Sequence, residues 1–284
     1  MHTPYSKCVL PLWLIFLCWT PLRGQSSGND SVPSPYRVNF WISGSLLAAG
    51  ATANYLGSTQ MLEKAQITRA EMQALDKDVI NSIDRWAFRQ DAAMIDANGR
   101  YSDIVLGTGV VLPFALLLDS PLRRDWVELL VMYLETMSLV PNLYEWSFFG
   151  PYFQNRIRPV TYYEELSYEQ RNSGNNRNSF YSGHVATVAA ATFFMVKVYS
   201  DYHPGVGNDK YLLYTAALLP PVLLGYFRVR GLRHFPSDVA VGIGIGAVCG
   251  ILVPELHRLS EKGVTLGVYS TQESTGVAFS WHPR

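Results

Sequence analysis

The chain has 284 residues, 48% of them hydrophobic and 16% charged, and its 23 basic residues balance its 23 acidic ones. An apolar fraction this high excludes a disordered chain. A formal net charge of zero leaves no basic surface that would attract nucleic acid, so we expect no nucleic-acid partner.

Residues 1–25 are typical of a secretory signal. Lys7 precedes an apolar run that extends from Val9 to Trp19, and the small residue Gly24 follows near the end of the segment. Residues 26–36 are polar and contain prolines, which predicts a linker between the signal and the fold.

Metal and disulfide sites are not expected. The cysteines, at positions 8, 18 and 249, are too few and too scattered for a disulfide framework or a cysteine-ligated metal. No carboxylate cluster and no His/Cys set with ligand spacing lies near the motifs described below. The sequence therefore predicts a protein that needs no metal and no other cofactor.

Six apolar segments follow the linker, and none shows the alternation of a strand. They lie at 38–57, 104–118, 126–143, 183–199, 211–227 and 239–254. The sequence therefore predicts an all-α fold over 37–258, a bundle of five to six core helices, followed by a tail over 259–284. Most segments are shorter than the roughly 20 residues that span a bilayer, so a soluble bundle is an alternative. We favour a transmembrane bundle.

Glycines recur at four-residue spacing in the last apolar segment, at Gly242, Gly246 and Gly250. This spacing favours a close approach by a neighbouring helix. In the tail, apolar residues alternate weakly from Val264, which predicts either a short hairpin or a frayed terminus.

The polar region 58–103 is predicted to be helical and to lie on the bundle or on the bilayer surface. Thr68 and Glu71 have the spacing of a capping box. Five apolar residues would line one helical face: Val79, Ile80, Ile83, Trp86 and Ala87.

Charged and polar motifs adjoin three of the apolar segments. Arg156 and Arg158 follow the third segment, Ser182-Gly183-His184 opens the fourth, and the stretch from Arg228 to Asp238 joins the fifth to the sixth. In an up-and-down bundle all three groups emerge at the same end, so we expect the functional site there.

Two of these motifs lie at predicted helix starts. Pro236 suits the first helical position and places Asp238 in the first turn, where it can hold the imidazole of His234 or simply cap its helix. Ser182 suits an N-cap, and His184 follows it where backbone N–H groups favour an anion. Together with the arginines, the two histidines indicate a phosphate site with a histidine nucleophile.

These residues resemble the phosphatidic acid phosphatase type 2 superfamily over about 36–258. The family pattern is Lys, six residues, Arg-Pro; then Pro-Ser-Gly-His; then Ser-Arg, five residues, His, three residues, Asp. The matching residues here are Arg158-Pro159, Tyr181-Ser182-Gly183-His184, and Phe227-Arg228 followed by His234 and Asp238. The spacing of the third part matches fully.

The resemblance implies a role for each matching residue. His234 would attack phosphorus, Asp238 would orient His234, and His184 would protonate the leaving oxygen. The phosphoryl oxygens would be bound by Arg158, Arg228, Ser182 and the amide of Gly183.

The chain departs from the family pattern at three positions. Pro151 stands where the lysine is expected, and no lysine occurs between Lys77 and Lys197. Tyr181 and Phe227 replace a proline and a serine. We expect Arg156 to supply the missing charge as a further phosphate-binding residue, although a guanidinium is not equivalent to an ammonium.

The leading hypothesis is therefore a metal-independent phosphatase that hydrolyses a phosphate monoester or pyrophosphate of a membrane lipid through a phosphohistidine. The alternative from another class is a catalytically weak relative that binds a phosphorylated lipid, which the loss of the lysine favours. A vanadate-dependent peroxidase is a distant third, since it would be expected to keep the lysine. Nothing in the sequence indicates an oligomeric state.

The expected location is a bacterial-type inner membrane, with the active site facing the periplasm. Basic residues at the motif-free end, such as Arg123, Arg124 and Arg258, favour that end as cytoplasmic. Six full spans after a cleaved signal would reverse this orientation. The expectation therefore requires that 38–57 does not fully cross.

Overall fold

The computed structural model describes residues 33–261, 264–270 and 275–281. The predicted signal 1–25 and most of the predicted linker 26–36 lie outside the described residues. The boundaries 37–258 and 259–284 stay predictions.

All six apolar segments form helices, most of them longer than the segments themselves. They are α1 (Phe40–Leu62), α3 (Ile95–Val111), continued by the 3₁₀ helix η3 (Leu112–Leu118), α5 (Trp126–Trp146), α7 (Gly183–Tyr202), α8 (Lys210–Ala217) with α9 (Leu219–Arg230), and α10 (Pro236–Glu261). The fifth segment is divided between two helices because Pro220 and Pro221 lack the N–H groups that would continue α8.

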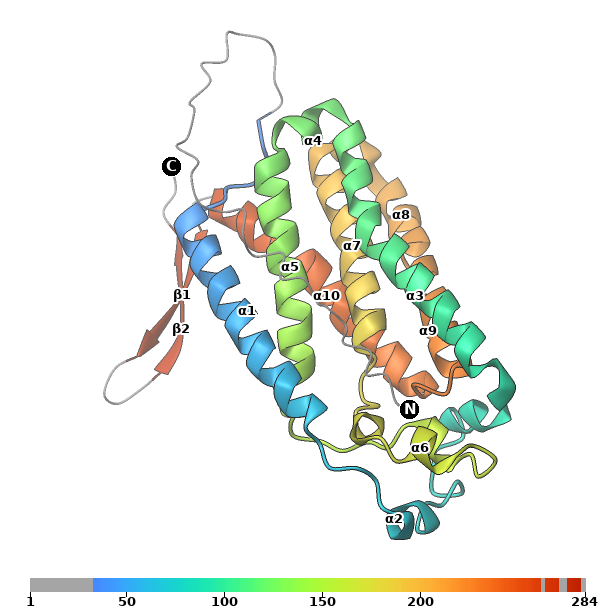
Figure 1. The fold of residues 1–284 in the computed structure, drawn as a ribbon. Helices are drawn as coiled ribbons and strands as arrows, with labels where there is room; N and C mark the ends of the chain where they lie inside the picture. The colour runs from blue at the N-terminus through green and yellow to red at the C-terminus, as the bar shows by residue number, and fades with distance from the viewer. Residues whose placement is uncertain (1–32, 262–263, 271–274, 282–284) are drawn as a thin grey trace, which may run out of the picture. The chain divides into compact units, whose positions relative to one another are not determined.

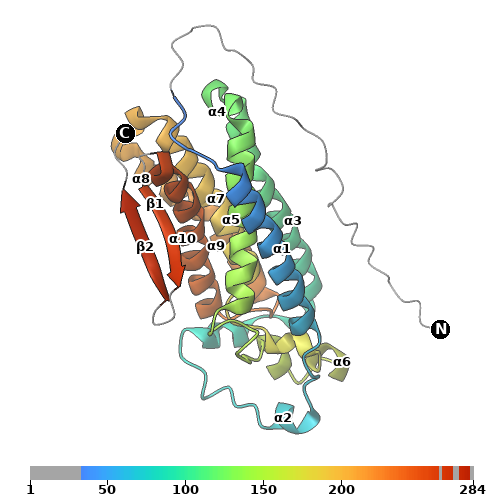
Figure 2. The ribbon, with the colours of Figure 1, turned by 90° about the vertical axis from the view of Figure 1, so that its left-hand side faces the viewer.

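Helix α7 lies inside the bundle. It packs most extensively against α10 and also contacts α3, α5 and α9, while α1 runs beside α5 on the outside (Figures 1 and 2). Small residues make the inner position of α7 possible, because Ala186, Ala189, Ala190 and Ala191 are all fully buried.

The glycine stripe of α10 faces α7, as its spacing predicts. A Cβ atom on Gly246 would lie 2.1 Å from the carbonyl oxygen of Ala186, and one on Gly250 would lie 2.4 Å from that of Ala190. A Cβ atom on Gly242 would lie 2.7 Å from the carbonyl oxygen of Ser182. The stripe therefore lets the two backbones approach at the point where α7 begins.

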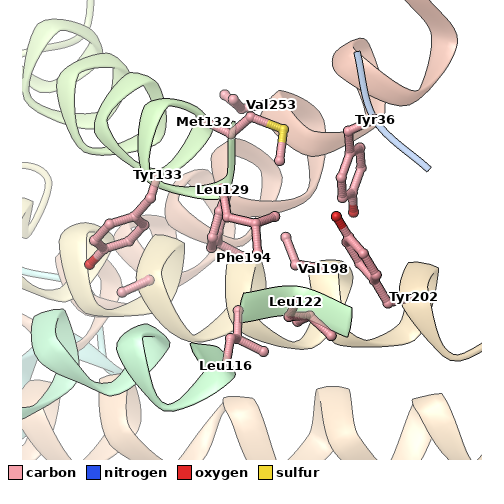
Figure 3. Close-up of a cluster of buried hydrophobic side chains, with 11 residues drawn as sticks. Tyr36, Leu116, Leu122, Leu129, Met132, Tyr133, Phe194, Val198, Tyr202 and Val253 are labelled. Carbon is pink, nitrogen blue, oxygen red and sulfur yellow. The ribbon is translucent and has the colours of Figure 1, made fainter. Parts of the chain in front are cut away.

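Aromatic and aliphatic side chains fill the bundle at the motif-free end (Figure 3). The rings of Tyr36 and Tyr202 lie 5.9 Å apart, and the hydroxyl of Tyr36 donates to Asp201 at 2.8 Å. The chain before α1 is thereby anchored to the end of α7.

The region 58–103 differs from its prediction. The capping box of Thr68 and Glu71 is confirmed, but it opens only the short helix α2 (Arg69–Gln73). The predicted amphipathic helix is wrong, because a 3₁₀ helix, η1 (Asp84–Arg89), replaces the expected α-helix. The five residues do not share one face, since Val79 and Ile83 are 76% and 70% exposed whereas Ala87 is fully buried. The cause is tertiary: Asp84 binds the start of α10, as described below.

Shorter elements complete the chain. They are η2 (Ala92–Met94), α4 (Ser120–Arg124), η4 (Pro159–Tyr162), α6 (Tyr168–Arg171), η5 (Gly174–Arg177) and η6 (Pro204–Asp209). In the tail, β1 (Val264–Ser270) pairs antiparallel with β2 (Thr275–Trp281), so the hairpin alternative is confirmed. The fold is an all-α bundle with this hairpin appended.

Three helical stretches of the described chain are long and apolar enough to cross a membrane: Ala92–Leu118, Pro204–Arg230 and Pro236–Arg258. Helix α1 is not one of them, although its 23 residues rise about 34 Å, a span-like length. Helix α1 is therefore long enough to cross the membrane, but its composition is not that of a membrane-spanning helix.

Candidate active site

The three motif segments meet at one end of the bundle, as the sequence predicts. The backbone N–H of Arg158 donates to the carbonyl oxygen of Asn176 at 2.8 Å, and that of Arg156 donates to Arg177 at 3.0 Å. The N–H of Ser182 in turn donates to the carbonyl oxygen of Asp238 at 3.0 Å. Backbone hydrogen bonds therefore join the first motif to the loop before the second motif, and the second motif to the third.

His234 is 1% exposed and held by one hydrogen bond. Its Nδ1 lies 2.7 Å from the carbonyl oxygen of Ser179. A carbonyl only accepts, so Nδ1 carries the hydrogen and Nε2 keeps its lone pair. Burial, followed by the positive charges of Arg228 and Arg158, holds the pKa of His234 well below its usual range. The imidazole is therefore neutral, which is the state a nucleophile requires.

Asp238 lies in the first turn of α10, as predicted, but its contact with His234 is long. Its Oδ2 is 3.8 Å from His234 Nδ1, beyond hydrogen-bond distance. The carboxylate instead accepts from the Ser179 hydroxyl at 2.6 Å and from the Phe235 N–H at 2.8 Å. Ser179 thus contacts both groups, and Asp238 positions the histidine mainly through it.

Arg156 lies among carboxylates. Its Nη2 is 2.6 Å from Asp84 Oδ2, and its Nη1 pairs with Asp238 and donates to the Ser237 hydroxyl at 2.9 Å. Its guanidinium also lies over the ring of Phe235, at 4.6 Å from the centroid. This arrangement commits both terminal nitrogens of Arg156 to protein acceptors.

Asp84 completes this arrangement. It is fully buried and accepts from the Ser237 N–H at 2.8 Å and the Ser237 hydroxyl at 2.7 Å. Burial by itself would raise the pKa of Asp84, but the hydrogen bonds from Ser237, Asn81 and Arg156 together hold that pKa below its ordinary value. The ionised carboxylate therefore fixes the start of α10.

Arg158 and Arg228 are buried without a carboxylate partner. They are 6% and 8% exposed, and neither forms an ion pair with another described residue. The Nε atoms of both, and the hydroxyl of Ser182, are buried and have no hydrogen-bond partner within the described part of the chain. Ser182 stands at the N-cap of α7, yet its side chain makes no capping bond. These donors suit an anion.

His184 and Gly183 form the first turn of α7 beside these groups. His184 lies within electrostatic range of Arg158, Arg228 and His234. A Cβ on Gly183 would lie 3.4 Å from the ring of Tyr144. The start of α7 thus adjoins the two buried arginines, as the motifs predict.

Four residues at this end were missed by sequence reasoning: Lys64, Asp84, Ser179 and Arg233. The first three belong to no motif and reach the site only through the fold. Arg233 directly precedes His234, and that adjacency was the available signal. None of the described residues forms a group of three or more His, Cys, Asp or Glu able to hold a metal ion.

Comparison with known proteins identifies a family for part of this chain. Residues 125–261 match the model of the PAP2 superfamily. A crystal structure described as the first transmembrane PAP2 type phosphatidylglycerolphosphate phosphatase, from Bacillus subtilis, is 19% identical; the likeness covers 74% of this chain and 93% of that one, with a TM-score of 0.40. No curated protein matches the chain. The recognition made from the motifs is confirmed by the family match.

Proposed function

Because residues 125–261 belong to the PAP2 superfamily, we propose that this chain is a membrane-embedded phosphatase that hydrolyses a lipid phosphate monoester or pyrophosphate. The observation that carries the proposal is the set of buried donors on Arg158, Arg228 and Ser182, which adjoins a neutral histidine. Unpaired buried charges are costly, and a phosphoryl group would satisfy them.

In the first chemical step, His234 Nε2 attacks phosphorus and forms a P–N bond. The bond from phosphorus to the lipid oxygen breaks, and the leaving oxygen takes a proton from His184. Burial, followed by the charge of Arg228, lowers the pKa of His184, and a bound phosphate raises that pKa again because its negative charge offsets the arginines. Arg158, Arg228, Ser182 and the Gly183 amide bind the phosphoryl oxygens while negative charge builds up on them.

In the second step, water attacks the phosphohistidine and gives a proton back to His184. The P–N bond breaks, its electron pair returns to His234 Nε2, and inorganic phosphate leaves. The hydrogen bond to Ser179 keeps the same ring nitrogen facing the reaction in both steps. No step uses a metal, since arginines supply the positive charge.

Exposed aromatic residues support a membrane location. Near the motif end lie Phe148 and Phe153, which are 77% and 56% exposed, and at the opposite end lies Trp41, which is 90% exposed. Large aromatic rings favour the two membrane–water interfaces. A site at one interface suits a substrate whose tail stays in the bilayer while its phosphate reaches the arginines. We place this end on the periplasmic side of a bacterial-type inner membrane, from the secretory segment and the basic residues of the other end.

Phosphate release tests the proposal. Purified protein in detergent would be given phosphatidic acid, phosphatidylglycerophosphate, undecaprenyl pyrophosphate and lipid A, since all four present the same group to the site. We expect release from at least one, reduced by more than tenfold in His234→Ala and unchanged in the control His203→Ala at the opposite end. The reaction should persist in chelator, and an acid-labile phosphoenzyme should form only when His234 is present.

The second candidate is a protein that binds a phosphorylated lipid without hydrolysing it. Pro151 favours it, because the family lysine is missing there. Binding of inorganic phosphate with no release from any of the four lipids would support this candidate and overturn the phosphatase.

A further inference from the structure

Pro151 stands where the family pattern has a lysine, which leaves the site one cation short of that pattern. The cations at this end of the bundle, besides the two buried motif arginines, include Lys64, Arg156 and Arg233. Their hydrogen bonds distinguish them, because a donor that is already bound to the protein is not free for phosphate.

Lys64 lies beside Pro151 but does not replace the lysine. Its ammonium donates to the carbonyl oxygens of Pro151 and Gln154 and to the side chain of Asn155, the last two at 2.9 and 2.8 Å. These contacts use all three of its donors. Lys64 therefore holds the loop around Pro151.

The terminal nitrogens of Arg156 are also bound to other protein groups. Its two terminal nitrogens bind Asp84, Asp238 and Ser237. Two carboxylates offset its single positive charge, so the cluster adds no positive charge to the anion site.

Arg233 is different. It is half-buried, and its side chain makes no hydrogen bond or ion pair within the described residues. Its charge acts on His184, His234, Arg158 and Arg228, so it lies within electrostatic range of the core of the site.

The backbone fixes this position. Leu232 is fully buried and has a φ of 55°, a left-handed conformation that is rare for a branched apolar residue. Its carbonyl oxygen accepts from the Val160 N–H at 3.1 Å, and the N–H of Arg233 donates to the carbonyl oxygen of Arg228 at 3.0 Å. This turn ties Arg233 to both motif segments that carry the buried arginines, next to the nucleophile.

We propose that Arg233 is a phosphate-binding residue that supplies the third positive charge of the anion site, together with Arg158 and Arg228. The inference rests on the proposed phosphate site, and its test is separable from turnover. Because Arg233 is more exposed than the two motif arginines, it binds phosphoryl oxygens from the solvent side.

The test compares Arg233→Gln, Arg233→Lys and the control Arg230→Gln, whose guanidinium binds Tyr226 at the end of α9. Affinity for inorganic vanadate, measured by calorimetry, is followed beside kcat and KM for lipid hydrolysis. We expect Arg233→Gln to weaken vanadate binding by about tenfold and to lower kcat/KM by about 10²-fold, mainly through kcat. Arg233→Lys restores most of both losses, and Arg230→Gln matches the wild type.

The outcomes are distinct. Unchanged vanadate affinity in Arg233→Gln overturns the role of Arg233, whether or not the enzyme turns over. A melting temperature that falls equally in Arg233→Gln and Arg233→Lys, with equal loss of binding, assigns Arg233 a structural role and also overturns it. Absence of lipid hydrolysis in the wild type overturns the proposed phosphatase, while weaker vanadate binding in Arg233→Gln would still support the anion contact.

Discussion

The imidazole of His234 donates its Nδ1 hydrogen to the backbone carbonyl oxygen of Ser179, at a distance of 2.7 Å. The side chain of the same serine donates to Asp238. One residue between the first and second motifs therefore fixes the tautomer of the histidine and orders the carboxylate below it. Because the bond from His234 goes to the backbone of Ser179, a change of the Ser179 side chain removes only the bond to Asp238.

Stability should fall in acid because of His234. The imidazole is neutral in the folded state, where its pKa is well below the usual 6.5, and the unfolded chain takes up a proton near pH 6.5. Protons therefore favour unfolding as the pH drops below about 6.5, by at most about 1.4 kcal/mol per pH unit for this group. Thermal unfolding of the wild type and of His234→Asn between pH 7.5 and 5 checks this. The variant should lose less stability in acid, and equal slopes would contradict the prediction.

Asp84→Asn should destabilise the motif end. The change leaves Arg156 with one carboxylate and weakens the hold on Ser237 at the start of α10. We expect a loss of about 2 kcal/mol in unfolding free energy, low in the range for buried pairs because Arg156 is 27% exposed. Asp78→Asn, at an exposed acid of the same region, is the control. Denaturation midpoints that do not differ between the two variants would show that the Asp84 pair contributes nothing.

The glycine stripe provides a matched pair of substitutions on α10. Gly246→Ala forces a methyl group against the Ala186 carbonyl, which should cost about 2 kcal/mol through overpacking. Gly244→Ala meets nothing within 4 Å, and it should be neutral or stabilise by up to about 1 kcal/mol. Melting temperatures in detergent distinguish the two. The close α7–α10 contact would be in doubt if Gly246→Ala were as stable as Gly244→Ala.

Membrane orientation is tested by cysteines placed at the two ends. Ser173, exposed between α6 and η5, lies at the motif end, and Arg123, exposed in α4, lies at the other. In cells whose outer barrier is permeabilised, an impermeant thiol reagent should label Ser173→Cys and spare Arg123→Cys. The unsubstituted chain, which keeps its own cysteines, sets the background. Labelling only at Arg123→Cys would place the site in the cytoplasm.

Local features of the structure were predictable from the sequence. Pro236 begins α10 and Asp238 lies in its first turn because both preferences act within a few residues. The same holds for the capping box of Thr68 and Glu71. The meeting of the three motifs at one end of the bundle was also predictable, because an up-and-down bundle places alternate connections at the same end.

Contacts between distant parts of the chain could not be predicted in this way. The segment around Asp84 has the apolar spacing of a surface helix, yet the ion pair with Arg156 and the bonds to Ser237 hold it in a 3₁₀ turn. Likewise, no spacing rule places Lys64 beside Pro151. The partners of Arg156 were unexpected for the same reason, because Asp84 and Asp238 lie 72 and 82 residues from it in the sequence.

The ion pair between Asp84 and Arg156 also bears on how such sequences can change over time. Asp84 lies before the matched family segment 125–261, whereas Arg156 and Ser237 lie within it. A piece of chain limited to that segment would keep every motif residue but would lose Asp84, whose carboxylate holds Arg156 and Ser237 in place. Among related chains, an uncharged residue at position 156 should therefore be accompanied by an uncharged residue at position 84, whereas loss of Asp84 alone still leaves Arg156 paired with Asp238.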